Sequence, residues 1–226
     1  MKPIRGVILD VDGTLVDSND AHARAWVESL GEAGIDVEYE KVRRLIGMGG
    51  DKLMPEVSGI EEDSPAGKKI SESRSKIFKT KYLPHLKPFP QVEELLARMK
   101  DDGLRLVVAS SAKEDELKEL LKIAGATKFI EEKTSSNDAD NSKPDPDIVQ
   151  AALDELGLPR DEVIMIGDTP YDVEAAARAG IKSVAFRSGG WDDEGLSGAV
   201  AVYDGAADLL ARYDSSPLAK RASHTE

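Results

Sequence analysis

Residues 6–14 read Gly6-Val7-Ile8-Leu9-Asp10-Val11-Asp12-Gly13-Thr14. The first four residues of this segment are uncharged, and such a run is typical of a strand buried on both faces of a parallel sheet. The two aspartates are two positions apart, so while the chain stays extended both carboxylates point the same way. Gly13 then permits a sharp turn. The segment therefore predicts a buried strand that ends in a pair of carboxylates.

Further apolar runs predict more strands of the same sheet. They lie at residues 104–109, 163–166 and 183–186, with a weaker candidate at 129–131. Between them, apolar residues at helical spacing predict helices that end at Gly103, Gly125 and Gly157. Strands that alternate with helices of this length predict a doubly wound, parallel, Rossmann-like α/β sheet.

The first connection is too long for a simple crossover, because about 80 residues separate the first strand from the helix that begins near Gln91. This insert has three helical patterns, at residues 20–33, 38–46 and 65–82. We therefore expect an α-helical cap subdomain at residues 18–85, inserted into a core of residues 1–17 and 86–214. Residues 215–226 are small and polar, and we expect them to form a flexible tail.

Composition limits the classes of function. The 226 residues include 43 acidic and 30 basic side chains, a formal net charge of -13, and no cysteine. This acidity argues against nucleic acid or an anionic membrane as the main partner. The lack of cysteine excludes disulfides, thiolate zinc sites and cysteine nucleophiles. No apolar run has the length of a signal-peptide core or a membrane span, so we expect a cytoplasmic protein, as a monomer or weak homodimer.

Polar residues gather where the predicted strands end. They are Asp10 and Asp12, Ser110 and Ser111, and Asp168 and Asp172, with Lys143 ahead of the helix that leads to the last pair. In open parallel sheets, ligands bind at the carboxyl ends of the strands. We therefore expect these side chains to share one pocket.

That pocket would hold up to four carboxylates, and buried charges without partners are costly. A divalent cation together with Lys143 would balance them. Carboxylate oxygens combined with a phosphate ligand favour Mg²⁺ over zinc. Each element alone has an ordinary structural explanation, because Asp-Gly is a common turn and Asp and Thr are common helix caps. Their occurrence in order at successive strand ends favours a catalytic site.

At these residues the sequence resembles the haloacid dehalogenase superfamily, in its phosphatase branch with an inserted helical cap. Four motifs carry the resemblance: residues 10–18, Ser110, residues 143–147 and residues 167–172. The resemblance extends over roughly residues 4–210. It implies Mg²⁺-dependent hydrolysis of a small phosphorylated metabolite through an aspartyl-phosphate.

The resemblance also implies individual roles. Asp10 would be the nucleophile, and Asp12 the general acid and base. Asp10, the backbone carbonyl of Asp12 and Asp168 would bind Mg²⁺, and Asp172 would steady the metal or Lys143. The residues expected to bind the phosphoryl group are Ser110, Ser111, Lys143, Gly13 and Thr14.

Substrate specificity is expected in the cap, which would close over the site and exclude water. His22 lies four residues before Trp26 on one helical face, either as a substrate contact or as a histidine packed at the cap hinge. Residues 47–52 resemble the specificity loop of the family, in which Lys52 would bind an anionic group. The alternative is an ordinary turn between helices.

Three other functions are alternatives to a phosphatase. A dehalogenase needs neither Mg²⁺ nor an acid at the position of Asp12. A phosphomutase of the β-phosphoglucomutase kind is a closer rival, but such sequences usually carry an acidic residue where Gly167 stands. A non-catalytic binding protein is disfavoured because each motif is complete. The sequence leaves phosphoglycolate, sugar phosphates and nucleoside monophosphates open as substrates.

Overall fold

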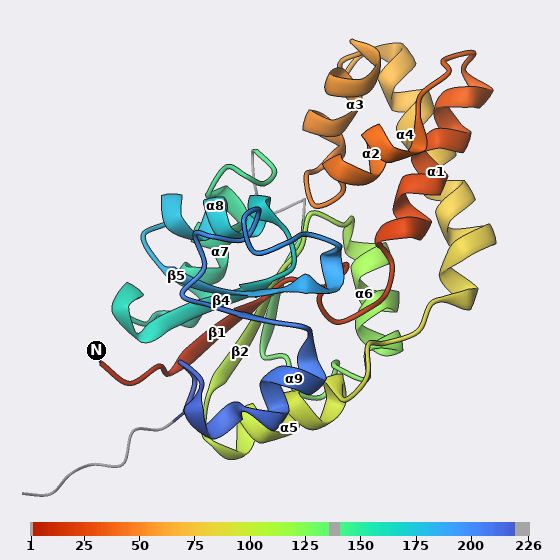
Figure 1. Ribbon diagram of the computed structural model, residues 1–226. Coiled ribbons are helices and arrows are strands. Elements are labelled where there is room, and N and C mark those ends of the chain that lie inside the picture. Colours follow the sequence, from red (N-terminus) through yellow and green to blue (C-terminus); the bar gives the residue numbers. More distant parts are fainter. Residues whose placement is uncertain (1, 136–140, 220–226) are drawn as a thin grey trace, which may run out of the picture.

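The computed structural model describes residues 2–135 and 141–219. Its core is a parallel sheet in the order β3-β2-β1-β4-β5-β6 (Figure 1). The strands are β1 (Gly6–Leu9), β2 (Arg105–Ala109), β3 (Glu132–Thr134), β4 (Val163–Gly167), β5 (Lys182–Phe186) and β6 (Ala201–Tyr203). This is the Rossmann strand order, and it confirms the predicted fold class.

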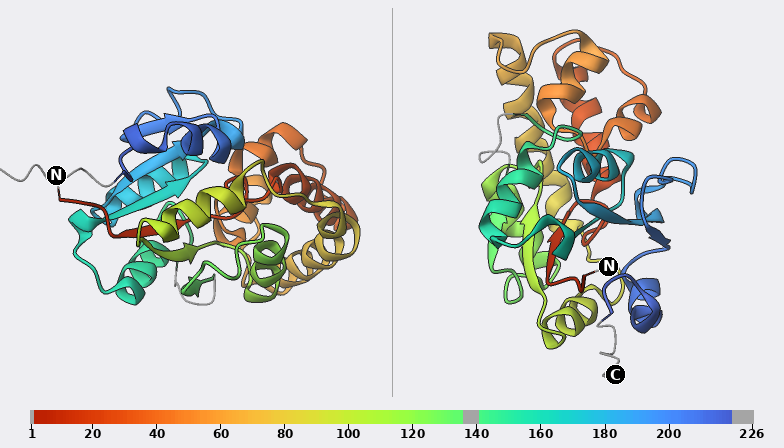
Figure 2. Two further views of the ribbon diagram at one scale, coloured as in Figure 1. Left: turned by 90° about the horizontal axis from the view of Figure 1, so that it is seen from below. Right: turned by 90° about the vertical axis from the view of Figure 1, so that its left-hand side faces the viewer.

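Helices cover both faces of the sheet, as Figure 2 shows. They are α5 (Val92–Asp101), α6 (Glu114–Ile123), α7 (Asp147–Leu156), α8 (Pro170–Arg178) and α9 (Ala206–Ala211). Val7 and Leu9 pack with α5, α6 and α9, whereas Ile8 packs with α7 and α8. Successive side chains of a strand point to opposite faces, so Val7, Ile8 and Leu9 are apolar because β1 is buried on both faces.

The cap contains α1 (Asn19–Glu32), α2 (Tyr39–Leu45), α3 (Gly50–Ser58) and α4 (Pro65–Ile77), followed by a π-helical turn at Phe78–Tyr82. It lies beyond the carboxyl end of β1 (Figure 1). Its own apolar cluster consists of Ala23, Trp26, Leu30, Val42, Ile46, Leu53, Met54 and Ile70. The two connections to the core run side by side, because Val16 pairs with Pro88 in an antiparallel bridge.

Several features differ from the sequence-based expectation, among them α3, which begins at Gly50 inside the expected specificity loop of residues 47–52. The edge strand β3 lies at Glu132–Thr134, not at residues 129–131, and β6 and α9 were not predicted. The expected tail from residue 215 is wrong for its first residues, because Leu218 is 1% exposed and packs into the core. The remainder of that tail, residues 220–226, lies outside the described residues.

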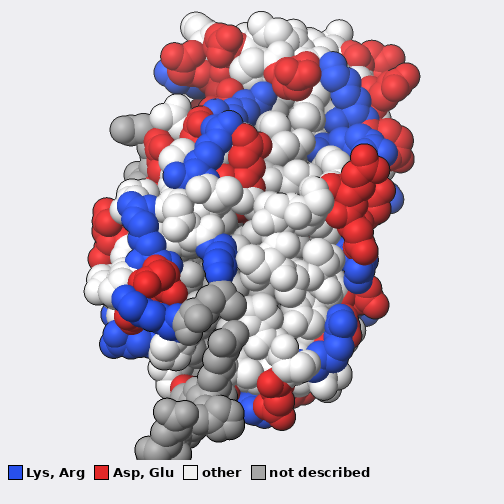
Figure 3. All heavy atoms as spheres, turned by 60° about the vertical axis from the view of Figure 1, so that its left-hand side comes forward, with Lys and Arg blue, Asp and Glu red and all other residues white. Residues whose placement is uncertain are grey.

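The surface carries charges of both signs. On the face in Figure 3, Lys and Arg side chains alternate with Asp and Glu side chains around an uncharged area. Within residues 2–135 and 141–219, no helix combines the length and apolarity needed to cross a bilayer.

Candidate active site

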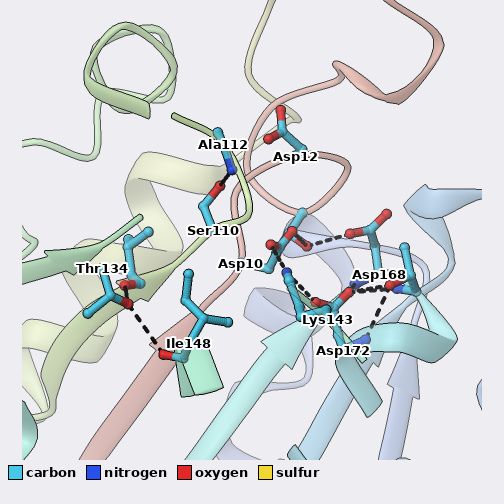
Figure 4. A network of polar contacts seen from close by, with 12 residues as sticks. Asp10, Asp12, Ser110, Ala112, Thr134, Lys143, Ile148, Asp168 and Asp172 are labelled. Carbon is cyan, nitrogen blue, oxygen red and sulfur yellow. Dashed lines mark hydrogen bonds and ion pairs between the residues drawn. The ribbon is translucent and has the colours of Figure 1, made fainter. Parts of the chain in front are cut away.

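Asp10 directly follows β1 and lies at the carboxyl edge of the sheet (Figure 4). Its backbone N–H donates to the Ile166 carbonyl at 2.9 Å, which continues the pairing with β4. The side chain is 7% exposed. Its Oδ1 accepts a hydrogen bond from Lys143 Nζ at 2.5 Å, and its Oδ2 lies 3.3 Å from Thr14 Oγ1. The carboxylate is therefore held on both sides.

Lys143 is buried between two carboxylates, with Nζ 2.5 Å from Asp10 Oδ1 and 2.7 Å from Asp172 Oδ1. Burial alone would lower the pKa of Lys143, but the charges of Asp10 and Asp172 outweigh it and raise the pKa above its ordinary value. The ammonium group therefore keeps its charge at neutral pH.

Asp172 has two tasks at the start of α8. Its Oδ2 accepts from the Thr169 backbone N–H at 3.0 Å and from Thr169 Oγ1 at 2.6 Å, which completes a capping box with Pro170 in the first turn. Its Oδ1 accepts from Lys143. Asp172 therefore caps α8 with Oδ2 and binds Lys143 with Oδ1.

Three buried aspartates, Asp10, Asp168 and Asp172, offer carboxylate oxygens that lie within 4.8 Å of one another. Burial raises the pKa of Asp168 well above its ordinary value, and the charges of Asp172 and Asp10 raise it further. Burial also raises the pKa of Asp10, to about 7, although Lys143 opposes this. Lys143 supplies a single positive charge beside these three carboxylates, and their oxygen donors fit Mg²⁺.

The turn after β1 brings this cluster together. Gly13 has φ +78°, and a Cβ atom there would lie 2.1 Å from Asp168 Oδ2 and 2.2 Å from Asn19 Nδ2. Only glycine fits. Asp168 accepts from Asn19 Nδ2 at 2.8 Å and from Thr14 Oγ1 at 2.8 Å. Thr14 and Asn19 therefore orient Asp168, a role of Asn19 that the sequence did not predict.

Asp12 has its carboxylate directed to the cap side of the site. Its Oδ1 accepts from Ser18 Oγ at 2.5 Å and lies 2.7 Å from His22 Nε2. Burial opposes ionisation of Asp12, yet His22 and the Ser18 hydroxyl outweigh it and hold the pKa of Asp12 below its usual range. The Asp12 side chain is not part of the aspartate cluster, and metal binding by its backbone carbonyl stays a prediction.

A cavity of about 270 Å³ separates the core from the cap. The predicted site residues that line it are Asp10, Asp12, Ser111, Lys143 and His22. Ser111 Oγ is buried and has no hydrogen-bond partner among the described residues, so it is available to a ligand. Ser110 Oγ instead accepts from the Ala112 backbone N–H at 3.1 Å (Figure 4).

Lys52 does not line this cavity. Its Nζ lies 2.5 Å from Asp145 Oδ2, so it joins α3 of the cap to the loop that follows Lys143. A role in substrate binding therefore stays a prediction for Lys52. The glycine-rich loop ends at Gly49, where a Cβ atom would lie 1.9 Å from Ser142 Oγ. Close approach of the core loop requires glycine at that position.

A Mg²⁺ site predicts a thermal shift. At a Mg²⁺ concentration about 100 times its dissociation constant, binding should stabilise the native state by about 2.7 kcal/mol. For a chain of this size, that raises Tm by about 5–10 °C. Scanning fluorimetry with and without Mg²⁺ measures the shift. Asp168→Asn should lose it, whereas Asp17→Asn, an exposed residue of the same motif, should keep it. An equal shift in all three proteins would disprove the assignment.

The structure combines a buried aspartate paired with a lysine, a cluster of aspartates, and a helical cap over a Rossmann-like sheet. This combination is typical of capped hydrolases. The chain belongs to the haloacid dehalogenase-like hydrolase family, whose model matches residues 7–186. This confirms the family predicted from the motifs.

Individual relatives agree. The phosphoglycolate phosphatase of Aquifex aeolicus is 30% identical over 185 residues, covering 80% of this chain and 83% of that protein. The phosphoglycolate phosphatase of Rhodospirillum rubrum is 30% identical over 215 residues, covering 91% and 89%. A solved hydrolase from Pseudomonas syringae has a TM-score of 0.87 and 30% identity, covering 96% of this chain and 100% of its own.

Proposed function

We propose that the protein is a Mg²⁺-dependent phosphatase that hydrolyses a small phosphorylated metabolite through an aspartyl-phosphate on Asp10. The observation that carries the proposal is the position of Asp10, which lines the cavity while it contacts Lys143 and belongs to the aspartate cluster. The phosphatase names of the relatives support it. The cavity of about 270 Å³ suits a small leaving group.

The reaction has two steps. Asp12 first takes up a proton from solvent on Oδ2, the oxygen that Ser18 and His22 leave free. An Asp10 oxygen attacks phosphorus, the bond to the leaving oxygen breaks, and Asp12 gives that oxygen this proton. Asp12 then removes a proton from water, the water oxygen attacks phosphorus, and inorganic phosphate leaves with Asp10 regenerated. Lys143 reduces the repulsion between Asp10 and the phosphate dianion. Mg²⁺, held by Asp10, Asp168 and the backbone carbonyl of Asp12 with Asp172 beside them, would supply further neutralisation of the phosphoryl oxygens.

The geometry around Gly167 favours a hydrolase over a mutase. A Cβ atom at Gly167 would lie 2.4 Å from Asp172 Cβ and 2.5 Å from its Cγ. A carboxylate-bearing side chain, as mutase-like sequences have at this position, therefore has no room while Asp172 caps α8. A Cβ atom at Gly50 would likewise lie 2.9 Å from Glu62 Oε1. The glycines leave the cap loop with few side-chain donors for holding a second phosphate.

The test separates hydrolysis from isomerisation. We expect the enzyme to release inorganic phosphate from at least one member of a panel of phosphoglycolate, sugar phosphates and nucleoside monophosphates. With β-glucose 1-phosphate and a trace of the 1,6-bisphosphate, phosphorus NMR should show no accumulation of glucose 6-phosphate. Rapid isomerisation with negligible free phosphate would establish a mutase instead.

A further inference from the structure

Glu116 is a buried carboxylate that the proposed reaction does not use. It lies in the first turn of the core helix α6, and its side chain is 0% exposed. Burying a carboxylate is costly unless it is paired and hydrogen-bonded. Both partners come from cap helix α4: Arg74 Nη1 donates to Oε2 at 2.7 Å and Ser75 Oγ donates to Oε1 at 2.5 Å. The core therefore keeps a buried charge at a contact with the cap.

Arg74 continues this contact towards the active site. Its Nη2 lies 2.6 Å from His22 Nδ1. A guanidinium group has donors only, so Nδ1 must accept, and the ring proton of His22 is on Nε2. That nitrogen lies 2.7 Å from Asp12 Oδ1 and donates to it. The arginine thus selects the one neutral tautomer of His22 that can donate to Asp12.

Aromatic packing fixes the same groups in orientation. The His22 ring stacks on Phe78 with centroids 4.0 Å apart and planes inclined by 13°. The Arg74 guanidinium lies over the Trp26 ring at 5.6 Å and over the Phe78 ring at 5.2 Å. Glu116, Arg74, His22 and Asp12 form a series of side chains linked by hydrogen bonds. Because Arg74 and His22 have little freedom to rotate, a displacement of Arg74 would also move the His22 ring.

We propose that Glu116 and Arg74 are positioning residues for Asp12: Glu116 holds the guanidinium of Arg74, which orients His22, which aims the Asp12 carboxylate at the leaving group. Glu116 and Asp12 belong to the core, whereas Arg74 and His22 belong to the cap. The series is complete only with the cap docked, so Asp12 is aligned only in a closed cavity. His22 and Ser18 both bond Oδ1 of Asp12, which leaves Oδ2 for the substrate.

The leaving group supplies the test, and the inference rests on the proposed function of Asp12 as proton donor. An alkyl phosphate needs protonation of its leaving oxygen, whereas p-nitrophenyl phosphate scarcely does. In Glu116→Gln, kcat/KM for an alkyl phosphate should fall by roughly 100-fold, and that for p-nitrophenyl phosphate by no more than about threefold. Arg74→Lys, which keeps the charge but cannot bridge Glu116 and His22, should show the same selectivity and serves if Glu116→Gln does not fold.

The matched control is Asp115→Asn. Asp115 is the neighbour of Glu116, and it pairs with Lys79 across the same contact between cap and core. Its substitution removes the same charge and an exposed ion pair between cap and core, and it should lower both kcat/KM values equally. If Glu116 only stabilises the contact between cap and core, Glu116→Gln should also lower both kcat/KM values equally. An equal loss in Glu116→Gln would overturn the inference.

Two further readouts separate the inference from the proposed function. If Asp12→Asn lowers kcat/KM equally for both substrates, the proposed function of Asp12 as proton donor is wrong. If Asp12→Asn is selective for the alkyl phosphate but Glu116→Gln is not, only the positioning role of Glu116 is wrong. In ¹⁵N-histidine spectra of the three histidines, His22 should be the Nε2–H tautomer in the wild type and lose that preference in Arg74→Met, which has no donor for Nδ1. An unchanged tautomer in Arg74→Met would contradict the role of Arg74.

Discussion

Asp10→Asn should lower kcat by roughly a thousandfold or more, the scale of loss when one member of a catalytic unit is removed. The amide keeps the shape of the side chain, and its oxygen still accepts from Lys143, so the site should stay assembled. What disappears is the anionic oxygen that attacks phosphorus. Phosphate release from p-nitrophenyl phosphate with saturating Mg²⁺ measures the effect, and mass spectrometry verifies that the introduced amide has not deamidated.

The control is Asp17→Asn, which carries the same change at an exposed position of the same motif and should retain nearly full activity. Thermal unfolding of both variants shows whether they are folded. A folded, undeamidated Asp10→Asn enzyme with kcat near that of the wild type would refute the assignment of Asp10 as the nucleophile.

Lys143→Met should damage both activity and stability. Methionine has a similar volume, but it leaves Asp10 and Asp172 without their shared ammonium group. Removing one partner of a buried ion pair typically costs about 3–5 kcal/mol of folding free energy, and losing a group that stabilises the transferring phosphoryl oxygens costs about 10²–10³ in kcat. Denaturant unfolding and steady-state kinetics measure the two effects separately.

Lys118→Met serves as the matched control, because Lys118 is exposed on α6. We expect it to change the free energy of unfolding by no more than about 0.5 kcal/mol. If Lys143→Met unfolds at the same denaturant concentration as Lys118→Met and keeps its kcat, the buried ammonium group has neither of the roles assigned to it.

The sequence predicted the core of the site because short apolar runs show where each strand ends. Once β1 and β4 are recognised as neighbouring parallel strands, Asp10 and Asp168 must follow them at the same edge. The capping pattern Thr169-Pro170-Tyr171-Asp172 also fixes where α8 begins. The structure adds that Asp172 belongs to the aspartate cluster and that Thr14 orients carboxylates.

The cap contacts could not be predicted in the same way, because they join residues far apart in the chain. Glu116 stands among the apolar positions of α6, and an acid on a buried face is the only local signal of its role. Arg74 is one of several basic residues on α4, and nothing local distinguishes it. Lys52 shows the opposite case: its glycine-rich neighbourhood suggested a ligand contact, yet tertiary packing brings Asp145 to it.

The central claim is that Asp10 carries the phosphoryl group between the two steps. The most direct measurement is rapid acid quenching of the enzyme during turnover of p-nitrophenyl phosphate with Mg²⁺, followed by peptide mass spectrometry. The account predicts a peptide that is heavier by one phosphoryl group on Asp10, and predicts its absence in Asp10→Asn. Sustained turnover with no phosphoryl group on any aspartate, or with one on a residue other than Asp10, would contradict it.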